Sequence, residues 1–194
     1  MLASASSARA QVLDGVGIPY LRDPASIDEG VIKSAFRAKG ATAAAAAEAL
    51  ARAKAEAVSK RHRGALVVGA DQILECGDAW LDKPADGERA ASHLRTLRGR
   101  THSLVSAVCV VQYGERAWRH VETARLTMWA FDDAFIERYL ERAGPAALES
   151  LGAYRLEGLG MQLFSDIEGD FFAILGLPLL PLLAFLRRNG WAAA

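Results

Sequence analysis

The stretch VVGADQILECGDAWLDKP, residues 67–84, constrains the fold of this 194-residue chain more than any other part of it. It begins in an apolar run that predicts a fully buried strand, and two small residues then remove side-chain bulk just before Asp71 and Gln72. A turn at Gly77 brings the chain back toward Lys83. A carboxylate that emerges from a buried strand is costly to place unless a charged group meets it. The sequence therefore predicts a β-hairpin that carries an acid into the interior of the protein.

Two explanations of this acid stay open at this point. Across the hairpin, Lys83 is placed to form a structural ion pair with Asp71, or both residues face a bound anion and its metal ion. Ion pairs beside tight turns also occur for purely structural reasons. The hairpin alone does not decide between the two explanations.

Length and charge limit the classes of function. A chain of this length can bury a full core, and we expect a single domain over residues 1–194. The 23 basic and 23 acidic side chains balance, so no long-range electrostatic field favours a nucleic acid or an anionic membrane as a partner. Any phosphate site must therefore be local.

The cysteines and the apolar segments indicate a cytoplasmic protein. Cys76 and Cys109 lie in apolar runs without the spacing of a metal site, and we interpret them as reduced core thiols. The N-terminal segment lacks the charged and apolar regions of a secretory signal. The apolar segment 171–186 is too short to span a membrane and carries two prolines, so we expect a strand end followed by a buried helix.

Helical and strand patterns alternate along the chain. Helices are expected over residues 8–13, within the alanine-rich segment 31–61, and over 86–97, 133–142 and 179–188. Strands are expected at 1–3 and 18–21, in a long hairpin formed by 101–113 and 118–129, and around 153–154 and 161–164. Because the long hairpin is antiparallel while helices alternate with strands, the sequence predicts an α/β fold with a mixed, twisted sheet flanked by helices.

Single polar residues give only weak signals. Ser6 and Arg9 lie at the start of the first expected helix, where free N–H groups and the helix dipole attract a phosphate, but this signal alone favours an ordinary N-cap with a solvated arginine. Lys54 belongs to a basic run that a solvated helix face also explains. The four histidines show no metal-ligand spacing.

The order of the short motifs is far more specific than any one of them. The chain reads LASAS at residues 2–6, GADQ at 69–72, KP at 83–84, LRGRTH at 97–102 and GLGMQLFSDIEGDFFAILGLPL at 158–179. In this order and at these spacings, the motifs resemble the Maf family of nucleoside triphosphate pyrophosphatases over essentially the whole chain. The resemblance implies two lobes with a central cleft, as in Maf-like and inosine-triphosphatase-like folds.

Two residue pairs resemble one branch of that family. Asp71-Gln72 and Glu157-Gly158 look like the branch that prefers 7-methylguanosine triphosphate, whereas the thymidine and uridine triphosphate branch has Asp-Thr and Gln-Gly there. Glu157 also has Arg155 as a neighbour, and a surface ion pair between them is the alternative interpretation. Ala8 departs from both branches, since the methylguanosine branch has tryptophan and the pyrimidine branch has arginine there. If that tryptophan packs on the cationic methylated base, Ala8 removes a cation–π contact. Leu151 stands where the family often has alanine.

The resemblance also assigns roles to polar residues. Asp71 corresponds to the residue assigned as proton acceptor. Cleavage between the α- and β-phosphates needs cations, a bridging metal ion and a carboxylate that orients water. The residues that match catalytic positions are Asp71, Lys54 and Lys83. Those expected to bind substrate are Ser6, Arg9, Gln72 and Glu157. Glu29 and Asp71 supply oxygen ligands suited to Mg²⁺ or Mn²⁺.

The resemblance thus predicts a cytoplasmic, metal-dependent pyrophosphatase that converts a nucleoside triphosphate to its monophosphate and pyrophosphate. The expected substrate is of the guanine type, with 7-methyl-GTP as the example, and the purpose is to remove non-standard nucleotides. One alternative keeps the reaction with dTTP and UTP or with a broad range of bases. Another is a non-catalytic, nucleotide-binding regulator of septum formation, which would need no poised water. The nucleotide is the expected partner, without nucleic acid or membrane, and a homodimer is left open.

Overall fold

The computed structural model describes residues 1–192, and the chain divides into two compact units. The first unit consists of Met1–Gln72, Val105–Glu122 and the segment from Asp170 onward. The second consists of Ile73–Leu104 and Thr123–Gly169. Three of the strands run from one unit into the other, because the boundaries fall inside them.

Five strands form one sheet in the order β2-β1-β3-β4-β5. Their bounds are β1 Val67–Cys76, β2 Ala79–Leu81, β3 Thr101–Gln112, β4 Glu115–Met128 and β5 Phe164–Glu168. The five-stranded sheet is antiparallel and not mixed as expected, and within residues 1–192 isolated parallel bridges join Leu2 to Arg22 and Val68. The predicted α/β fold with helices flanking a sheet is confirmed, as are both predicted hairpins.

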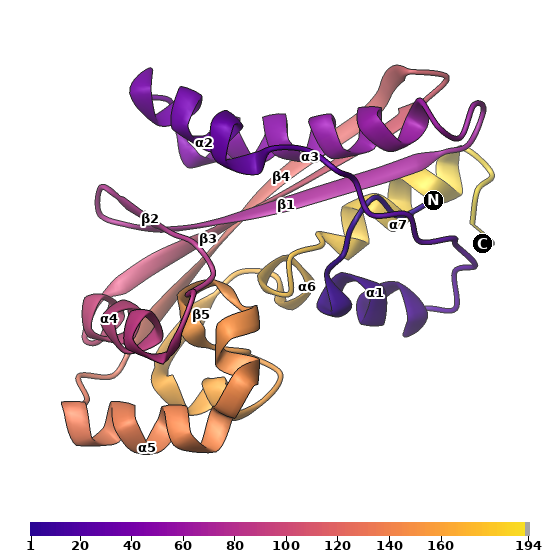
Figure 1. The fold of residues 1–194 in the computed structure, drawn as a ribbon. Coiled ribbons are helices and arrows are strands. Elements are labelled where there is room, and N and C mark those ends of the chain that lie inside the picture. Colours follow the sequence, from indigo (N-terminus) through magenta and orange to yellow (C-terminus); the bar gives the residue numbers. More distant parts are fainter. Residues whose placement is uncertain (193–194) are drawn as a thin grey trace. The chain divides into compact units, whose positions relative to one another are not determined.

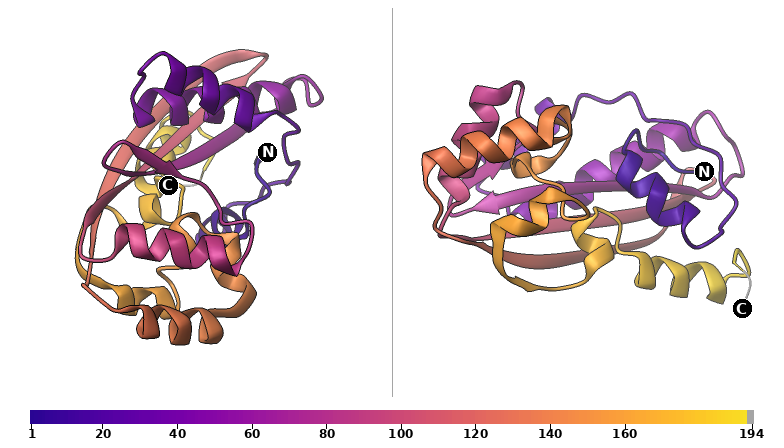
Figure 2. Two further views of the ribbon diagram at one scale, coloured as in Figure 1. Left: turned by 60° about the vertical axis from the view of Figure 1, so that its left-hand side comes forward. Right: turned by 90° about the horizontal axis from the view of Figure 1, so that it is seen from below.

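In the first unit the strands lie between two layers of helices (Figure 1). On one face lies α3 (Ala43–Ser59), with α2 (Glu29–Ala38) beside it. On the other face lie α1 (Ser7–Asp14) and α7 (Leu179–Arg188), and Figure 2 shows the same layers from two further sides. The predicted ends of α7 are those of the structure, because Pro178 precedes its first residue and Gly190 follows its last turn.

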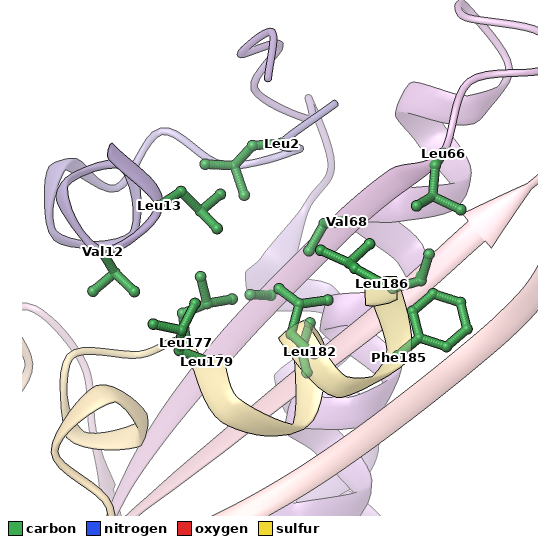
Figure 3. Packing of buried hydrophobic residues seen from close by; sticks show 13 residues of the cluster. Leu2, Val12, Leu13, Leu66, Val68, Leu177, Leu179, Leu182, Phe185 and Leu186 are labelled. Atoms are coloured by element: carbon green, nitrogen blue, oxygen red, sulfur yellow. The ribbon is translucent and has the colours of Figure 1, made fainter. Parts of the chain in front are cut away.

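One hydrophobic core cluster of the first unit lies between the sheet and the α1–α7 layer. Its members are apolar side chains from four parts of the chain (Figure 3): Leu2, Val12, Leu13, Leu66, Val68, Ala70, Val108, Val110, Leu177, Leu179, Leu182, Phe185 and Leu186. Side chains of a strand point alternately to its two faces. Since Val68 and Ala70 belong to this core, the odd-numbered residues of β1 point toward α3.

Helix α3 approaches β1 closely at Gly69. A Cβ atom on this residue would lie 2.2 Å from the carbonyl oxygen of Ala51 and 2.9 Å from Cβ of Ala55. Only glycine leaves room for so close an approach of helix and strand. The facing residues of α3 are alanines, which combine small size with high helix propensity. The alanine-rich segment is therefore helical as predicted, and its small side chains set its distance from the sheet.

The second unit contains α4 (Gly87–Leu97), α5 (Asp133–Ala143) and the shorter strands. The predicted strands around 153–154 and 161–164 are wrong, apart from Phe164, where β5 begins. Residues Leu151–Ala153 and Leu159–Leu163 form 3-10 turns instead. Ala153 has a φ of 65°, in the left-handed region that a strand excludes.

Two further predictions in the first unit are wrong. Residues 18–21 form no strand, and the Tyr20 hydroxyl is turned to α1, where it donates to the carbonyl oxygen of Ala10. Residues Phe171–Ile174 are not a strand end but a short helix, α6, which Asp170 caps. Within residues 1–192, no helix has both the length and the apolar character needed to cross a membrane.

Candidate functional site

Lys54 of α3 brings two carboxylates together. Its Nζ lies 2.5 Å from Oδ1 of Asp71 and 2.8 Å from Oε1 of Glu29. The Lys54 and Asp71 side chains are only 10% and 5% exposed, whereas that of Glu29 is 45% exposed. The hairpin suggested Lys83 as the cation that pairs with Asp71. In the structure, Lys54 forms this ion pair instead. The charge of the buried acid is thus compensated by a residue 17 positions away in the sequence.

The local packing explains this meeting. Asp71 lies two residues after Gly69 on β1, so its side chain also points to the α3 face. Lys54 follows Ala51 by about one helical turn, which places both on the face of α3 that meets β1. Glu29 opens α2, whose N-cap is Asp28. The glycine of the GADQ motif therefore allows the close approach through which Lys54 reaches the acid.

The second oxygen of Asp71 has no partner among residues 1–192. Oδ2 is buried and accepts no hydrogen bond from any described group. Such an atom is costly to bury unless a further ligand satisfies it. A divalent cation or an ordered water molecule fits this position chemically. No cluster of three or more histidine, cysteine, aspartate or glutamate side chains in the described chain could hold a metal ion. Glu29 and Asp71 therefore fit a metal ion that also takes water and phosphate oxygens as ligands, as Mg²⁺ commonly does.

The guanidinium of Arg9 is held on two sides. Its Nε donates to the carbonyl oxygen of Gly176 at 2.8 Å, and its Nη1 donates to Oγ of Ser4 at 3.1 Å. Burial lowers the pKa of Arg9 below its ordinary value, while the negative charges of Asp71 and Glu29 act in the opposite direction. Arg9 therefore belongs to the same electrostatic environment as the two carboxylates.

Ser6 is the N-cap of α1, as predicted. Its Oγ accepts a hydrogen bond from the backbone N–H of Arg9 at 3.3 Å. This is the ordinary capping role, and a phosphate role for Ser6 stays a prediction.

Gln72 points to the face opposite to that of Asp71. Its Nε2 lies 2.8 Å from Oγ of Ser106 and 3.0 Å from the carbonyl oxygens of both Ala173 and Ile174. The GADQ motif presents the acid and the amide as neighbours, but the alternation of β1 sends them to different faces of the sheet.

Lys83 and Glu157 belong to the second unit. Lys83 is exposed. The Glu157 carboxylate forms an ion pair with Arg155 at 2.9 Å, which the sequence offered as the alternative interpretation. A pocket of about 290 Å³ in this unit is lined by Arg155 and Glu157 together with Tyr139 and Arg142. The substrate roles of Lys83 and Glu157 rest on the family resemblance and stay predictions.

Three residues at the site were missed by sequence reasoning. Ser4 and Gly176, which hold Arg9, lie inside the LASAS and GLPL-containing motifs, so the motifs carried a signal for both. Ser106 lies in an apolar strand run and carried none.

Comparisons with known proteins give a consistent result. The Maf-like protein family matches residues 1–189. A nucleoside triphosphate pyrophosphatase of Paramagnetospirillum magneticum is 53% identical over 190 residues, which cover 98% of each chain. Another protein of that name, from Granulibacter bethesdensis, is 52% identical over 97% of this chain and 96% of its own. A 7-methyl-GTP pyrophosphatase of Rhizobium meliloti is 48% identical over 98% of this chain and 96% of its own.

Proposed function

This chain belongs to the Maf-like protein family, and we propose that it is an enzyme that hydrolyses a nucleoside triphosphate to its monophosphate and pyrophosphate. Its relatives named nucleoside triphosphate pyrophosphatase or 7-methyl-GTP pyrophosphatase support this reaction class. The structural observation that carries the proposal is the buried Oδ2 of Asp71, which lacks a partner among the described residues beside Lys54 and Glu29.

Asp71 is the group that acts on water. Lys54 fixes its carboxylate through Oδ1, which leaves Oδ2 to accept a hydrogen bond from a water molecule. A carboxylate in this position orients the attacking water and takes up its proton as the phosphoanhydride bond breaks. Since Lys54 lies on the buried face of α3, the carboxylate is oriented before substrate arrives, and pre-organisation of this kind lowers the barrier to reaction.

Glu29 and Asp71 would hold a divalent metal ion, Mg²⁺ or Mn²⁺. When bound, such an ion neutralises phosphate oxygens and stabilises the charge that develops on them. The chain contributes two carboxylates that already converge on one cation, the Lys54 ammonium. The half-exposed Glu29 is free to exchange part of that contact for a metal ion, because a partly solvated carboxylate loses little when it changes partners.

Arg9 binds phosphate oxygens of the substrate. Two of its N–H groups are engaged by Gly176 and Ser4, which fixes the plane of the guanidinium. The other N–H groups then present a rigid fork of donors of the kind that suits phosphate. Ser6 at the start of α1 adds the N-terminal end of a helix, which favours a negative charge. Lys83 supplies a further positive charge, by family resemblance.

We propose a guanine-type base for the substrate. The Asp71-Gln72 and Glu157-Gly158 pairs and the relatives named 7-methyl-GTP pyrophosphatase support it. Ala8 in place of a tryptophan favours a weaker preference for the methylated base. A preference for dTTP and UTP, or a broad one, remains the alternative. The buried free cysteines support a cytoplasmic location, where thiols stay reduced.

Release of pyrophosphate from a panel of nucleotides tests the reaction. We expect turnover of a guanine-type triphosphate with Mg²⁺ or Mn²⁺ and its loss when the metal ion is chelated. Turnover of dTTP and UTP alone would move the base preference to the alternative. Binding of nucleotides without any pyrophosphate release, by folded protein and with either metal, would instead favour the regulatory role.

A further inference from the structure

Arg22 binds the loop that leads into α1. Its Nε donates to the carbonyl oxygen of Ser4 at 2.9 Å, and its Nη2 donates to that of Ala5. An isolated parallel bridge brings Arg22 beside this loop, and there the N–H of Leu2 donates to the carbonyl oxygen of Leu21 at 2.8 Å. The planar fork of the guanidinium therefore binds two consecutive carbonyl groups of the chain.

These two contacts fix the orientation of two peptide groups. A peptide group is planar and trans, so a fixed carbonyl oxygen also fixes the direction of the N–H group that follows it. The oxygen of Ala5 shares its peptide group with the N–H of Ser6, and this N–H donates to Oγ of Ser4 at 3.2 Å. Arg22 therefore holds the backbone that gives the Ser4 hydroxyl one of its two hydrogen bonds.

The other hydrogen bond to that hydroxyl comes from Arg9, whose Nη1 donates to Oγ of Ser4 at 3.1 Å. A hydroxyl oxygen has two lone pairs, so the Ser6 N–H and the Arg9 guanidinium occupy both. Ser4 and Arg9 are only 5% and 9% exposed, whereas Arg22 is exposed. The contacts thus run from Arg22 at the surface, through Ser4, to the buried guanidinium of Arg9.

We propose that Arg22 is a positioning residue for Arg9 in triphosphate binding. This inference rests on the proposed function and adds a residue to it, since Arg22 lies outside the motifs that resemble the family. Without the guanidinium of Arg22, the peptide groups that follow Ser4 and Ala5 are free to rotate. The Ser4 hydroxyl then no longer holds Arg9 in place, and the phosphate groups bind more weakly whichever base they carry.

The variants Arg22→Met and Arg22→Lys test the inference together. Methionine removes the charge and the donors, whereas lysine keeps the charge on a compact ammonium that lacks the planar fork. Both variants should raise the KM for GTP and for UTP about tenfold at nearly constant kcat, since small misplacements of binding groups have large effects. Binding of inorganic pyrophosphate, measured by calorimetry, should weaken to a similar extent.

Two further variants complete the test. On a Ser4→Ala background, which lacks the connecting hydroxyl, Arg22→Met should add a loss of no more than about twofold, because both changes interrupt the same chain of contacts. Arg188→Met is the matched control. Arg188 is another exposed arginine of the first unit, and its Nε donates to the carbonyl oxygen of Ala184 at 3.1 Å. Its replacement should leave KM and pyrophosphate binding unchanged.

Three outcomes would overturn the inference. A near-normal KM in Arg22→Lys beside a raised KM in Arg22→Met would mean that charge alone explains the role of Arg22. Additive losses in the double variant with Ser4→Ala would mean that the two residues act separately. A lowered Tm with unchanged KM and pyrophosphate binding in Arg22→Met would make the contacts of Arg22 purely structural.

Failure of the proposed function is distinguishable from these outcomes. Wild-type protein that releases no pyrophosphate from any triphosphate would contradict the proposed function. In that case, pyrophosphate binding that weakens in Arg22→Met, Arg22→Lys and Ser4→Ala but not in Arg188→Met would still support the positioning role. Wild-type protein that also binds no pyrophosphate would contradict both.

Discussion

Lys54 in the first unit and Arg155 in the second each hold a carboxylate, but the two ion pairs differ in burial and in reach. Lys54 and Asp71 are 17 residues apart, and both side chains are almost fully buried. Arg155 and Glu157 are two residues apart, and both side chains are 29% exposed. The first pair depends on the tertiary packing of α3 against β1, whereas the second needs only a local turn.

The difference indicates which pair is fixed and which can exchange partners. Breaking a buried pair leaves an uncompensated charge and costs about 3–5 kcal/mol, whereas exposed pairs contribute about 0–1 kcal/mol. We therefore expect Asp71 to keep Lys54 as its partner when a ligand binds. Glu157 can give up Arg155 for a ligand at little cost. The first unit thus contains a fixed ion pair, and the second contains an ion pair that can exchange partners.

The largest effect is expected for Asp71→Asn. This change keeps the shape of the side chain but removes its charge and its capacity to take up a proton, so kcat should fall by at least ~10²-fold. Asp23→Asn is the matched control, because it alters a surface ion pair of the same unit, with Arg61. Steady-state turnover of both variants, corrected for the folded fraction, is the measurement. A near-normal kcat in Asp71→Asn would contradict the role of Asp71 as the group that takes up the proton.

Lys54→Met tests the stability side of the comparison. It leaves Asp71 and Glu29 without their shared cation, and we expect the free energy of unfolding to fall by about 3–5 kcal/mol. Arg155→Met in the exposed pair should cost less than about 1 kcal/mol. Urea unfolding at pH 7 measures both. Added Mg²⁺ should raise the Tm of Lys54→Met more than that of the wild type if the two carboxylates bind the ion. An equal rise in both proteins would contradict the metal site.

The contrast between a local and a long-range ion pair also applies to what the sequence could predict. Local signals were sufficient for the N-cap at Ser6, for α7 and for the two hairpins, because capping residues, prolines and turns act over a few positions. They failed at 153–154, where Ala153 takes a left-handed conformation. Apolar composition alone did not separate a strand from such a turn.

In the candidate site, no periodic pattern in the sequence could predict that Lys54 contacts Asp71. That contact depends on the distance between α3 and β1, which Gly69 sets through tertiary packing. The order of the family motifs supplied the residues but not their geometry. One feature was readable and was missed: strand alternation alone places Asp71 and Gln72 on opposite faces.

Lys83→Ala should have a smaller effect, on kinetics alone. The side chain is exposed, so the Tm should stay within about a degree of the wild type. If Lys83 meets the leaving pyrophosphate, the loss of one charge-assisted hydrogen bond should lower kcat/KM about tenfold and weaken inhibition by pyrophosphate to a similar extent. Lys39→Ala, another exposed lysine, is the control and should change neither. A lowered Tm with unchanged kinetics would make Lys83 a structural residue.

The prediction for Glu157→Gln concerns the choice of base. Guanine presents two donors on its Watson–Crick edge, N1–H and the 2-amino group, and a carboxylate can accept from both. Thymine and uracil present one N–H between two carbonyl groups, which a carboxylate repels and an amide can match. An unmatched polar group typically costs ~1–3 kcal/mol, so the kcat/KM ratio of GTP to UTP should fall about ten- to a hundredfold. The Arg155 pair is exposed, so stability should change by less than about 1 kcal/mol.

Arg155→Met separates the two interpretations of Glu157. If the carboxylate reads the base, removing its surface partner leaves the reader in place, and the GTP to UTP ratio should stay within about threefold of the wild type. If Glu157 only pairs with Arg155, the Glu157→Gln and Arg155→Met variants should behave alike, with the ratio unchanged in both. Steady-state kcat/KM for the two nucleotides in the three proteins gives the answer. An unchanged ratio in Glu157→Gln would move base selection to other residues, and the exposed pair of the second unit would then be incidental.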